Sequence, residues 1–284
     1  MKEKPFSKYQ ILANAVMIIW TLAIILPFIL LFMSSITDEN TLVANGYSFF
    51  PKKFSLASYS YIIKSGGQIL KAYGVSIGVT VVGTLLNVLL SALMAYPLSV
   101  KNLPGRNVMM FFVFFTMLFN GGIVPSYIMW TGTFHIKDTI FAQLLPNFLL
   151  SAWNVMMIRT YFTTSIPDGL YEAAEIDGAS QFTIFWKIVL PLGKPILVTM
   201  GTFAGLAYWN DWTNGLYYIV KNTGLYNVQN LLNQMVQNIQ FLTQSSNSNV
   251  TAAASTIPAT GIQMAIAFVA ILPIMLIFPS FQKY

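Results

Sequence analysis

Six stretches of this sequence are long and apolar enough to cross a lipid bilayer as helices, and this pattern limits the possible folds more than any other feature. A membrane-spanning helix needs about 20 apolar residues. The stretches cover residues 11–36, 73–98, 108–130, 139–162, 192–218 and 257–281. Inside a bilayer the backbone must satisfy its own hydrogen bonds, which favours helices. The sequence therefore predicts an all-α, polytopic membrane protein, a single transmembrane domain over residues 1–284 with six transmembrane helices.

The composition agrees with this class. Only 8% of the residues are charged, whereas soluble domains carry about 25%. The net charge of +6 is interpreted as the surplus of Lys and Arg that membrane proteins keep in cytoplasmic loops, not as a nucleic-acid surface. Without cysteine, neither a disulfide nor a thiolate metal site can form.

Some of the stretches carry special features. The stretch at 11–36 is too long for the apolar core of a cleaved signal peptide and is expected to remain as the first span. Pro146 is expected to kink the span at 139–162 without ending it. In the stretch at 192–218, Lys194 and Asp211 bracket a short uncharged core.

The loop charges predict the orientation. Lys101 and Arg106 lie in a short loop without acids, and Lys2, Lys4 and Lys8 precede the first span. The positive-inside bias places both groups, and with six spans both termini, in the cytoplasm. The loop at 37–72 opposes this orientation, because it would put four lysines outside: Lys52, Lys53, Lys64 and Lys71.

The segment at 163–191, between the fourth and fifth spans, is too long for a turn and carries helix signals. Pro167 suits the first turn of a helix, and the acids that follow favour its N-terminal half. Gly178 is expected to end this helix in the left-handed conformation, and Ser180 to cap a second helix that runs to Pro191.

The first of these helices carries small and acidic side chains. Ala173 and Ala174 would leave a bare patch for the close approach of another protein, with Glu172 at its rim. The alternative is an amphipathic helix on the membrane surface, but such helices are normally rich in Lys and Arg. The acids favour docking to a protein.

This segment resembles the EAA loop in the membrane subunits of binding-protein-dependent ABC importers. The matching residues are Glu172, Ala173, Ala174, Asp177, Gly178, Ala179, Leu190 and Pro191. Together with the stretches at 120–125 and 278–284, the chain is similar to the maltose-permease-like second subunit, in a subgroup for complex oligosaccharides. Chains of that subgroup normally run a few residues further, so the resemblance predicts a truncation after Tyr284.

The resemblance implies a role for each part. The first helix would dock in a cleft of a cytoplasmic ATPase as a coupling helix, with Glu172 as the anchor and Gly178 fixing the corner. The chain would carry no cofactor, since ATP and Mg²⁺ would bind the partner ATPase, and it would lie in a bacterial cell membrane. The implied partners are a second homologous permease subunit, two ATPase subunits, an extracytoplasmic solute-binding protein, an oligosaccharide and membrane lipid.

An aromatic and polar cluster follows in the fifth stretch: Tyr208, Trp209, Asn210, Asp211 and Trp212. Aromatic faces and amides bind sugars, so the cluster is a candidate substrate pathway. The alternative is the aromatic belt expected at a membrane interface. The resemblance favours the belt, because substrate contacts in the maltose-type family lie mainly on the partner subunit.

Two pairs of glycines, Gly74 with Gly78 and Gly201 with Gly205, permit close helix crossings within the chain or with a partner. No catalytic, metal-binding or nucleotide-binding motif occurs, so the chain is not expected to be an enzyme. The alternative function is a secondary transporter or channel for a small polar solute. Such proteins commonly place ionisable residues in the membrane, and spans one, two, three and six have none.

Overall fold

The computed structural model describes residues 8–64, 66–244 and 259–281. Within these ranges the regular secondary structure is helical, apart from one isolated bridge between Thr37 and Phe54, and loops connect the helices. The chain divides into two compact units, Met1–Ile69 with Leu232–Leu276, and Leu70–Leu231 with Ile277–Tyr284. The predicted features at Lys2, Lys4, residues 257–258 and 282–284 lie outside the described residues.

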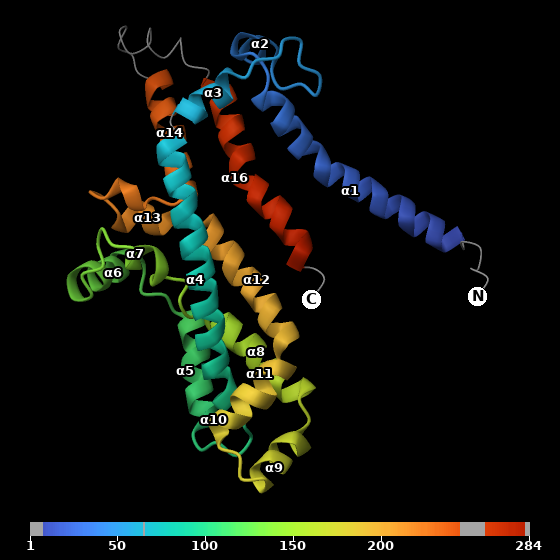
Figure 1. The fold of residues 1–284 in the computed structure, drawn as a ribbon, viewed down its shortest axis with the longest axis vertical. Helices are drawn as coiled ribbons and strands as arrows, with labels where there is room; N and C mark the ends of the chain where they lie inside the picture. Colours follow the sequence, from blue (N-terminus) through green and yellow to red (C-terminus); the bar gives the residue numbers. More distant parts are fainter. Residues whose placement is uncertain (1–7, 65, 245–258, 282–284) are drawn as a thin grey trace. The chain divides into compact units, whose positions relative to one another are not determined.

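The first unit contains α1 (Lys8–Ser35), α2 (Glu39–Asn45), α3 (Ala57–Lys64) and most of α16 (Ala259–Phe281), together with the start of α4 (Gly66–Ser99) and most of α14 (Val228–Gln244) (Figure 1). Phe32 of α1 packs on Phe268 of α16, with ring centroids 4.9 Å apart. The two carboxylate oxygens of Glu39 accept hydrogen bonds from the backbone N–H groups of Thr260 and Gly261, both at 2.8 Å. Contacts far apart in sequence therefore hold this unit together.

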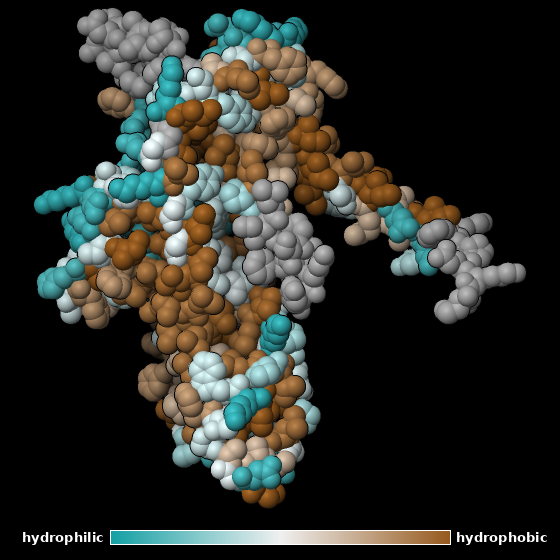
Figure 2. Space-filling model, in the orientation of Figure 1, coloured by the Kyte–Doolittle hydropathy of each residue, from teal (hydrophilic) through white to brown (hydrophobic). Residues whose placement is uncertain are grey.

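The second unit contains the rest of α4 and most of the remaining helices. These are α5 (Arg106–Leu118), α6 (Ile123–Ile128), η1 (Met129–Thr133), α7 (Phe141–Leu144), α8 (Ala152–Ser165), α9 (Asp168–Ile176), α10 (Gln181–Ile184), η2 (Phe185–Val189), α11 (Leu190–Leu192), α12 (Lys194–Asn210), α13 (Thr213–Tyr218) and η3 (Thr223–Leu225). Its main core lies among α4, α5, α8 and the segment from α9 to α12. Figure 2 shows hydrophobic side chains over the middle of this unit and a more polar surface at the end where α9 lies.

Two helices among the described residues are each long and apolar enough to cross a membrane, Tyr9–Ser35 and Gly67–Ser99. They coincide with the predicted stretches at 11–36 and 73–98. Two further pairs of helices pass the same test only as bent spans, and Thr260–Met275 is a shorter apolar helix. The protein is thus a helical membrane protein in which the third, fourth and fifth predicted stretches are interrupted.

The third predicted stretch, 108–130, is two helices that meet at 110°, not one. Gly122 between them has φ +90°, a conformation that side chains disfavour. The side-chain oxygen of Asn120 accepts the N–H of Gly122 at 2.8 Å. A glycine and a local amide contact therefore break this stretch.

The fourth predicted stretch, 139–162, is also broken, so the prediction that Pro146 only kinks it is wrong. Helix α7 ends at Leu144, and α8 does not begin until Ala152. Asn147 is left-handed, with φ +68°, and the carbonyl of Pro146 accepts the Nδ2 of Asn214 at 3.1 Å. Side chains of other segments accept or donate some of the backbone hydrogen bonds that a continuous helix would make here, such as that of the Pro146 carbonyl.

The fifth predicted stretch, 192–218, holds two helices. Helix α12 meets the preceding helical segment, Gln181–Leu192, at 78°. It ends at Asn210, where Asp211 Oδ1 accepts the N–H groups of Thr213 and Asn214 at 3.0 and 3.2 Å and starts α13. This carboxylate therefore binds the first backbone N–H groups of α13.

Helices α4 and α12 cross closely at one of the two predicted glycine pairs. A Cβ atom at Gly201 would lie 3.4 Å from Val88 Cγ2, and one at Gly205 would lie 3.3 Å from Thr84 Oγ1. A Cβ at Gly74 or Gly78 would meet no described atom within 4 Å. Only the pair on α12 therefore serves packing within the described chain.

Candidate functional site

The segment from α8 to α12 forms a corner at one end of the second unit. Helix α9 begins at Asp168, directly after Pro167. Asp168 lies in the first turn, where a carboxylate is favoured by the helix dipole. Its side chain also forms an exposed ion pair with Lys101, in the loop after α4. The two loops therefore lie on the same side of this unit.

The corner itself is built by Gly178, which has φ +78° as predicted. The N–H of Gly178 donates to the carbonyl of Glu175 at 3.0 Å, and the N–H of Ala179 donates to that of Ala174 at 2.9 Å. This paired arrangement is the Schellman motif that ends many helices at a left-handed glycine. It fixes the direction in which the chain leaves α9.

Ser180 begins the next helix, as the sequence predicts. Its Oγ accepts the N–H of Thr183 at 3.2 Å. The helical path then runs through α10, η2 and α11 to Leu192 and bends at Gly193. A Cβ on Gly193 would lie 2.6 Å from Phe162 Cε1, so only glycine permits this close approach.

The two alanines of the predicted docking patch differ in exposure in the structure. Ala174 is buried in the core with Ile166, Ile184 and Phe185, whereas Ala173 is exposed. Neighbouring positions on a helix point about 100° apart, so one faces inward when the other faces outward. The prediction of a bare patch made of both alanines is therefore wrong, and Ala174 anchors α9 instead.

The exposed face of α9 contains Glu172, Ala173, Ile176 and Asp177, and these four residues are called the α9 surface. Ile176 is 86% exposed. Its side chain lies beside the carboxylates of Glu172 and Asp177 and the methyl group of Ala173 on the exposed end of α9. The α9 surface thus offers an apolar tip, acids and little steric bulk.

Sequence reasoning missed the residue that ties α9 to α4 and α10. Gln181 Nε2 donates to Glu175 Oε1 at 2.8 Å, and the hydroxyl of Tyr96 donates to Gln181 Oε1 at 2.5 Å. Both bonds join residues of different helices, which no local pattern reveals. Of the two remaining motif residues, Leu190 packs against the core and Pro191 is exposed.

The second predicted cluster, residues 208–212, does not form one accessible surface. Tyr208, Trp209 and Asp211 are buried, while Asn210 and Trp212 are exposed. The hydroxyl of Tyr208 donates to the carbonyl of Leu144 at 2.9 Å. These aromatic side chains pack within the fold.

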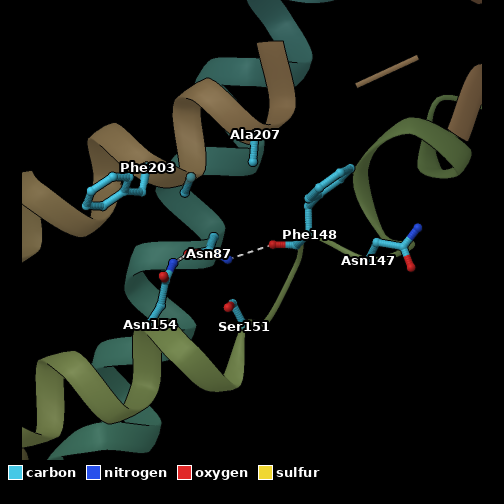
Figure 3. Close-up of a pocket in the computed structure, with 8 residues that line it drawn as sticks. Asn87, Asn147, Phe148, Ser151, Asn154, Phe203 and Ala207 are labelled. Carbon is cyan, nitrogen blue, oxygen red and sulfur yellow. Dashed lines mark hydrogen bonds between the residues drawn. The ribbon is translucent and has the colours of Figure 1, made fainter. Parts of the chain in front are cut away.

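A cavity of about 280 Å³ lies beside this cluster, between α4, α8 and α12, and four of its eight lining residues are polar (Figure 3). Its lining residues are Asn87, Asn147, Phe148, Ser151, Asn154, Phe203, Ala204 and Ala207. None of them belongs to the predicted pathway. Asn87 stands inside a long apolar run, and a polar residue in such a run is the one signal that could have indicated the site.

Comparisons with known proteins agree on the class of molecule. A family model for the binding-protein-dependent transport system inner membrane component matches residues 72–284. Protein LplC of Bacillus subtilis (strain 168) is 35% identical over 260 residues, covering 92% of this chain and 85% of LplC. The polygalacturonan/rhamnogalacturonan transport system permease protein YtcP of the same organism is 34% identical over 276 residues. The match covers 97% of this chain and 94% of YtcP.

A solved structure is similar over nearly the full length. It is a chain of a bacterial ABC transporter involved in the import of the acidic polysaccharide alginate. The sequence identity is 26%, the TM-score is 0.80, and the match covers 99% of both chains.

Proposed function

This chain belongs to the family of binding-protein-dependent transport system inner membrane components, and from that membership we propose how it couples transport to ATP hydrolysis. The chain is the permease subunit of an ABC importer, in which the ATPase is a separate subunit. In the proposal it forms half of the pathway for an oligosaccharide. A second homologous permease subunit forms the other half, and two ATPase subunits bind ATP and Mg²⁺.

The observation that carries the coupling proposal is the rigid corner at Gly178. Ala174 packs in the core, and the Schellman hydrogen bonds fix the end of α9. The α9 surface is thereby presented outward on an anchored helix. A force applied to such a helix is transmitted to the core, because packed elements move as units. We assign ATPase docking to Glu172, Ala173, Ile176 and Asp177, with Ala174, Gly178 and Ala179 shaping the corner.

The orientation proposal is six spans with both termini in the cytoplasm. Its support is the ion pair between Lys101 and Asp168. Lys101 lies in the short basic loop that the positive-inside bias places in the cytoplasm, and Asp168 opens α9. One side of the membrane therefore holds both the basic loop and the α9 surface.

The proposed cargo is an oligosaccharide, delivered by an extracytoplasmic solute-binding protein. Its support is the cargo of similar proteins, polygalacturonan or rhamnogalacturonan for YtcP and alginate for the solved transporter. Residues 208–212 are not proposed as the main sugar contacts, because three of the five side chains are buried in the fold.

Reconstitution tests this function. The chain would be co-expressed with its partner permease and ATPases, purified and placed in proteoliposomes with the solute-binding protein. Uptake of a labelled oligosaccharide should require ATP and every subunit. Uptake by the chain alone, driven by an ion gradient, would contradict the proposal and indicate a secondary transporter.

A further inference from the structure

We propose that the polar cavity between α4, α8 and α12 holds the hydroxyl-bearing face of one sugar ring as the cargo passes. The inference rests on the proposed oligosaccharide function. It assigns substrate contact to this subunit at residues outside the 208–212 cluster. The residues that carry it are Asn87, Ser151, Asn154 and Ala207.

Half of the residues that line the cavity are polar, in a part of the chain that is otherwise apolar. Asn87 and Asn154 are 2% and 5% exposed and lie on α4 and α8. Buried amides are costly unless they are hydrogen-bonded. A neighbouring groove of about 370 Å³ has a mostly apolar lining that includes Met94, Phe112 and Val155. The cavity thus differs in chemistry from a groove suited to a lipid tail.

The hydrogen bonds fix which atom of each amide faces which way. A backbone carbonyl only accepts, so Asn87 must turn its Nδ2 toward the carbonyl of Phe148, at 2.6 Å (Figure 3). Its Oδ1 then accepts the Nδ2 of Asn154 at 2.7 Å. The Oδ1 of Asn154 is therefore left over, and no hydrogen bond to it occurs among the described residues. We call Asn87 and Asn154 the relay, because one amide bonds to the next. The relay ends in a hydrogen-bond acceptor, Asn154 Oδ1, at the wall of the cavity.

Ser151 adds a second polar group to the same wall. It precedes α8, and its hydroxyl does not cap that helix. Asn147 also lines the cavity, but its side chain points away from the pair formed by Asn87 and Asn154 in Figure 3. The polar groups of Asn154 and Ser151 thus include an amide oxygen that can accept and a hydroxyl that can donate or accept.

This chemistry selects a class of ligand. A sugar hydroxyl can donate to Asn154 Oδ1 and exchange a hydrogen bond with Ser151. The rings of Phe148 and Phe203 add apolar surface for the C–H face of the sugar. No Lys, Arg or His is among the residues that line the cavity, so a carboxylate there would lack a charged partner. A volume of about 280 Å³ is at the lower end for ligand pockets, which suits a single ring.

The test uses the complete importer in proteoliposomes and three variants. Ala207→Leu fills the cavity without removing a hydrogen bond, and Ser151→Ala removes one polar group. Leu206→Phe is the matched control, because Leu206 is the neighbouring residue on α12 and does not line the cavity. The probes are labelled arabinotriose, xylotriose and trigalacturonate. Assembly and basal ATP hydrolysis are measured for every variant.

The expected result is a selective rise in KM for uptake. Ala207→Leu should raise KM at least about tenfold, and Ser151→Ala about threefold to tenfold, as for one lost hydrogen bond. Leu206→Phe should match the wild type. Hydroxyl faces are common to neutral and acidic sugars, so the effect should appear for whichever probe the wild type carries.

Two failures are distinguishable. If the wild type takes up the probe and both cavity variants keep its KM and maximal rate, the cavity is not a sugar contact, although the importer function stands. If the wild type shows no ATP-dependent uptake of any probe, the oligosaccharide function falls first. Loss of assembly in Ala207→Leu leaves Ser151→Ala to decide.

Discussion

The backbone N–H of Ala179 donates a hydrogen bond to the carbonyl of Ala174 at 2.9 Å, and Gly178 turns the chain between them. Ala174 is itself part of the core. The direction of the corner is thereby tied to the packed interior and not to a mobile loop. A coupling element of this kind should be sensitive to changes at the turn and to changes on its exposed face.

Replacing Gly178 by Leu should uncouple the importer while leaving insertion normal. A leucine at φ +78° costs about 1–2 kcal/mol, which tilts the corner and α9 with it. Substrate-stimulated ATP hydrolysis should fall in the reconstituted importer, and binding of the ATPase should weaken. Gly169→Ala is the control, since Gly169 lies within α9 and a Cβ there would have open space. Equal loss in both variants would contradict a specific role for the corner.

Glu172→Ala should weaken ATPase binding without loosening the subunit. Glu172 is exposed, and a charge-assisted hydrogen bond in a protein groove is worth about 1.5–3 kcal/mol. Affinity for the ATPase, measured with the purified permease pair, should drop by roughly 10–100-fold.

Glu175→Gln supplies the comparison for Glu172→Ala. It also removes one negative charge from α9, but it keeps an oxygen to accept from Gln181, as Glu175 Oε1 does at 2.8 Å. It should retain near-normal affinity. If the two variants weaken binding equally, net charge alone and not the α9 surface explains the contact.

The topology can be tested by cysteine labelling, because the chain has no native cysteine. A cysteine in place of Pro104 lies between Lys101 and Arg106, in the loop proposed to be cytoplasmic. An impermeant maleimide should leave it unlabelled in intact cells and label it after permeabilisation. Labelling in intact cells would show that this loop is outside, which is the opposite of the proposed orientation.

The sequence predicts the corner well because its signals are local. Pro167, Gly178 and Ser180 each act through backbone groups within a few residues, so their identity is enough. Local signals could not show that Ala174 faces the core while Ala173 faces outward. It depends on the core against which α9 packs, and a run of two alanines has no periodicity.

The breaks and the cavity show two further limits. Gly122 and Pro146 are visible in the sequence, but apolar length alone cannot distinguish a kinked span from two helices. The hydrogen bond between Asn87 and Asn154 joins residues 67 positions apart. Each asparagine is visible alone, while the pairing depends on how α4 and α8 pack.

Protonation of Asp138 in acid should weaken its hydrogen bonds to residues 220–222, which follow α13. Desolvation alone would raise the pKa of Asp138, but the N–H groups of Val220, Lys221 and Asn222 and the charge of Lys137 outweigh it. The pKa therefore lies below the ordinary 3.8. The protection factors for hydrogen exchange at residues 220–222, which correct for the pH dependence of intrinsic exchange, should be highest above the ordinary pKa and should fall as pH falls through the lowered pKa.

Asp138→Asn is the comparison for this acid effect. The amide oxygen still accepts N–H groups but does not titrate, so exchange should lose its dependence on this group. Equal acid sensitivity in both proteins would mean that another group controls the segment.

The last prediction concerns the carboxylate that holds the start of α16. Both oxygens of Glu39 accept N–H groups of that helix, from Thr260 and Gly261 at 2.8 Å. Negative charge at a helix N-terminus is favourable, and hydrogen bonds to charged groups contribute about 1.5–3 kcal/mol. Glu39→Gln turns one acceptor into a donor that faces an N–H, so the unfolding midpoint in detergent should fall clearly. Asn40→Ala, on the exposed next position of α2, should leave it nearly unchanged. An unchanged midpoint in Glu39→Gln would show that this contact does not stabilise the unit.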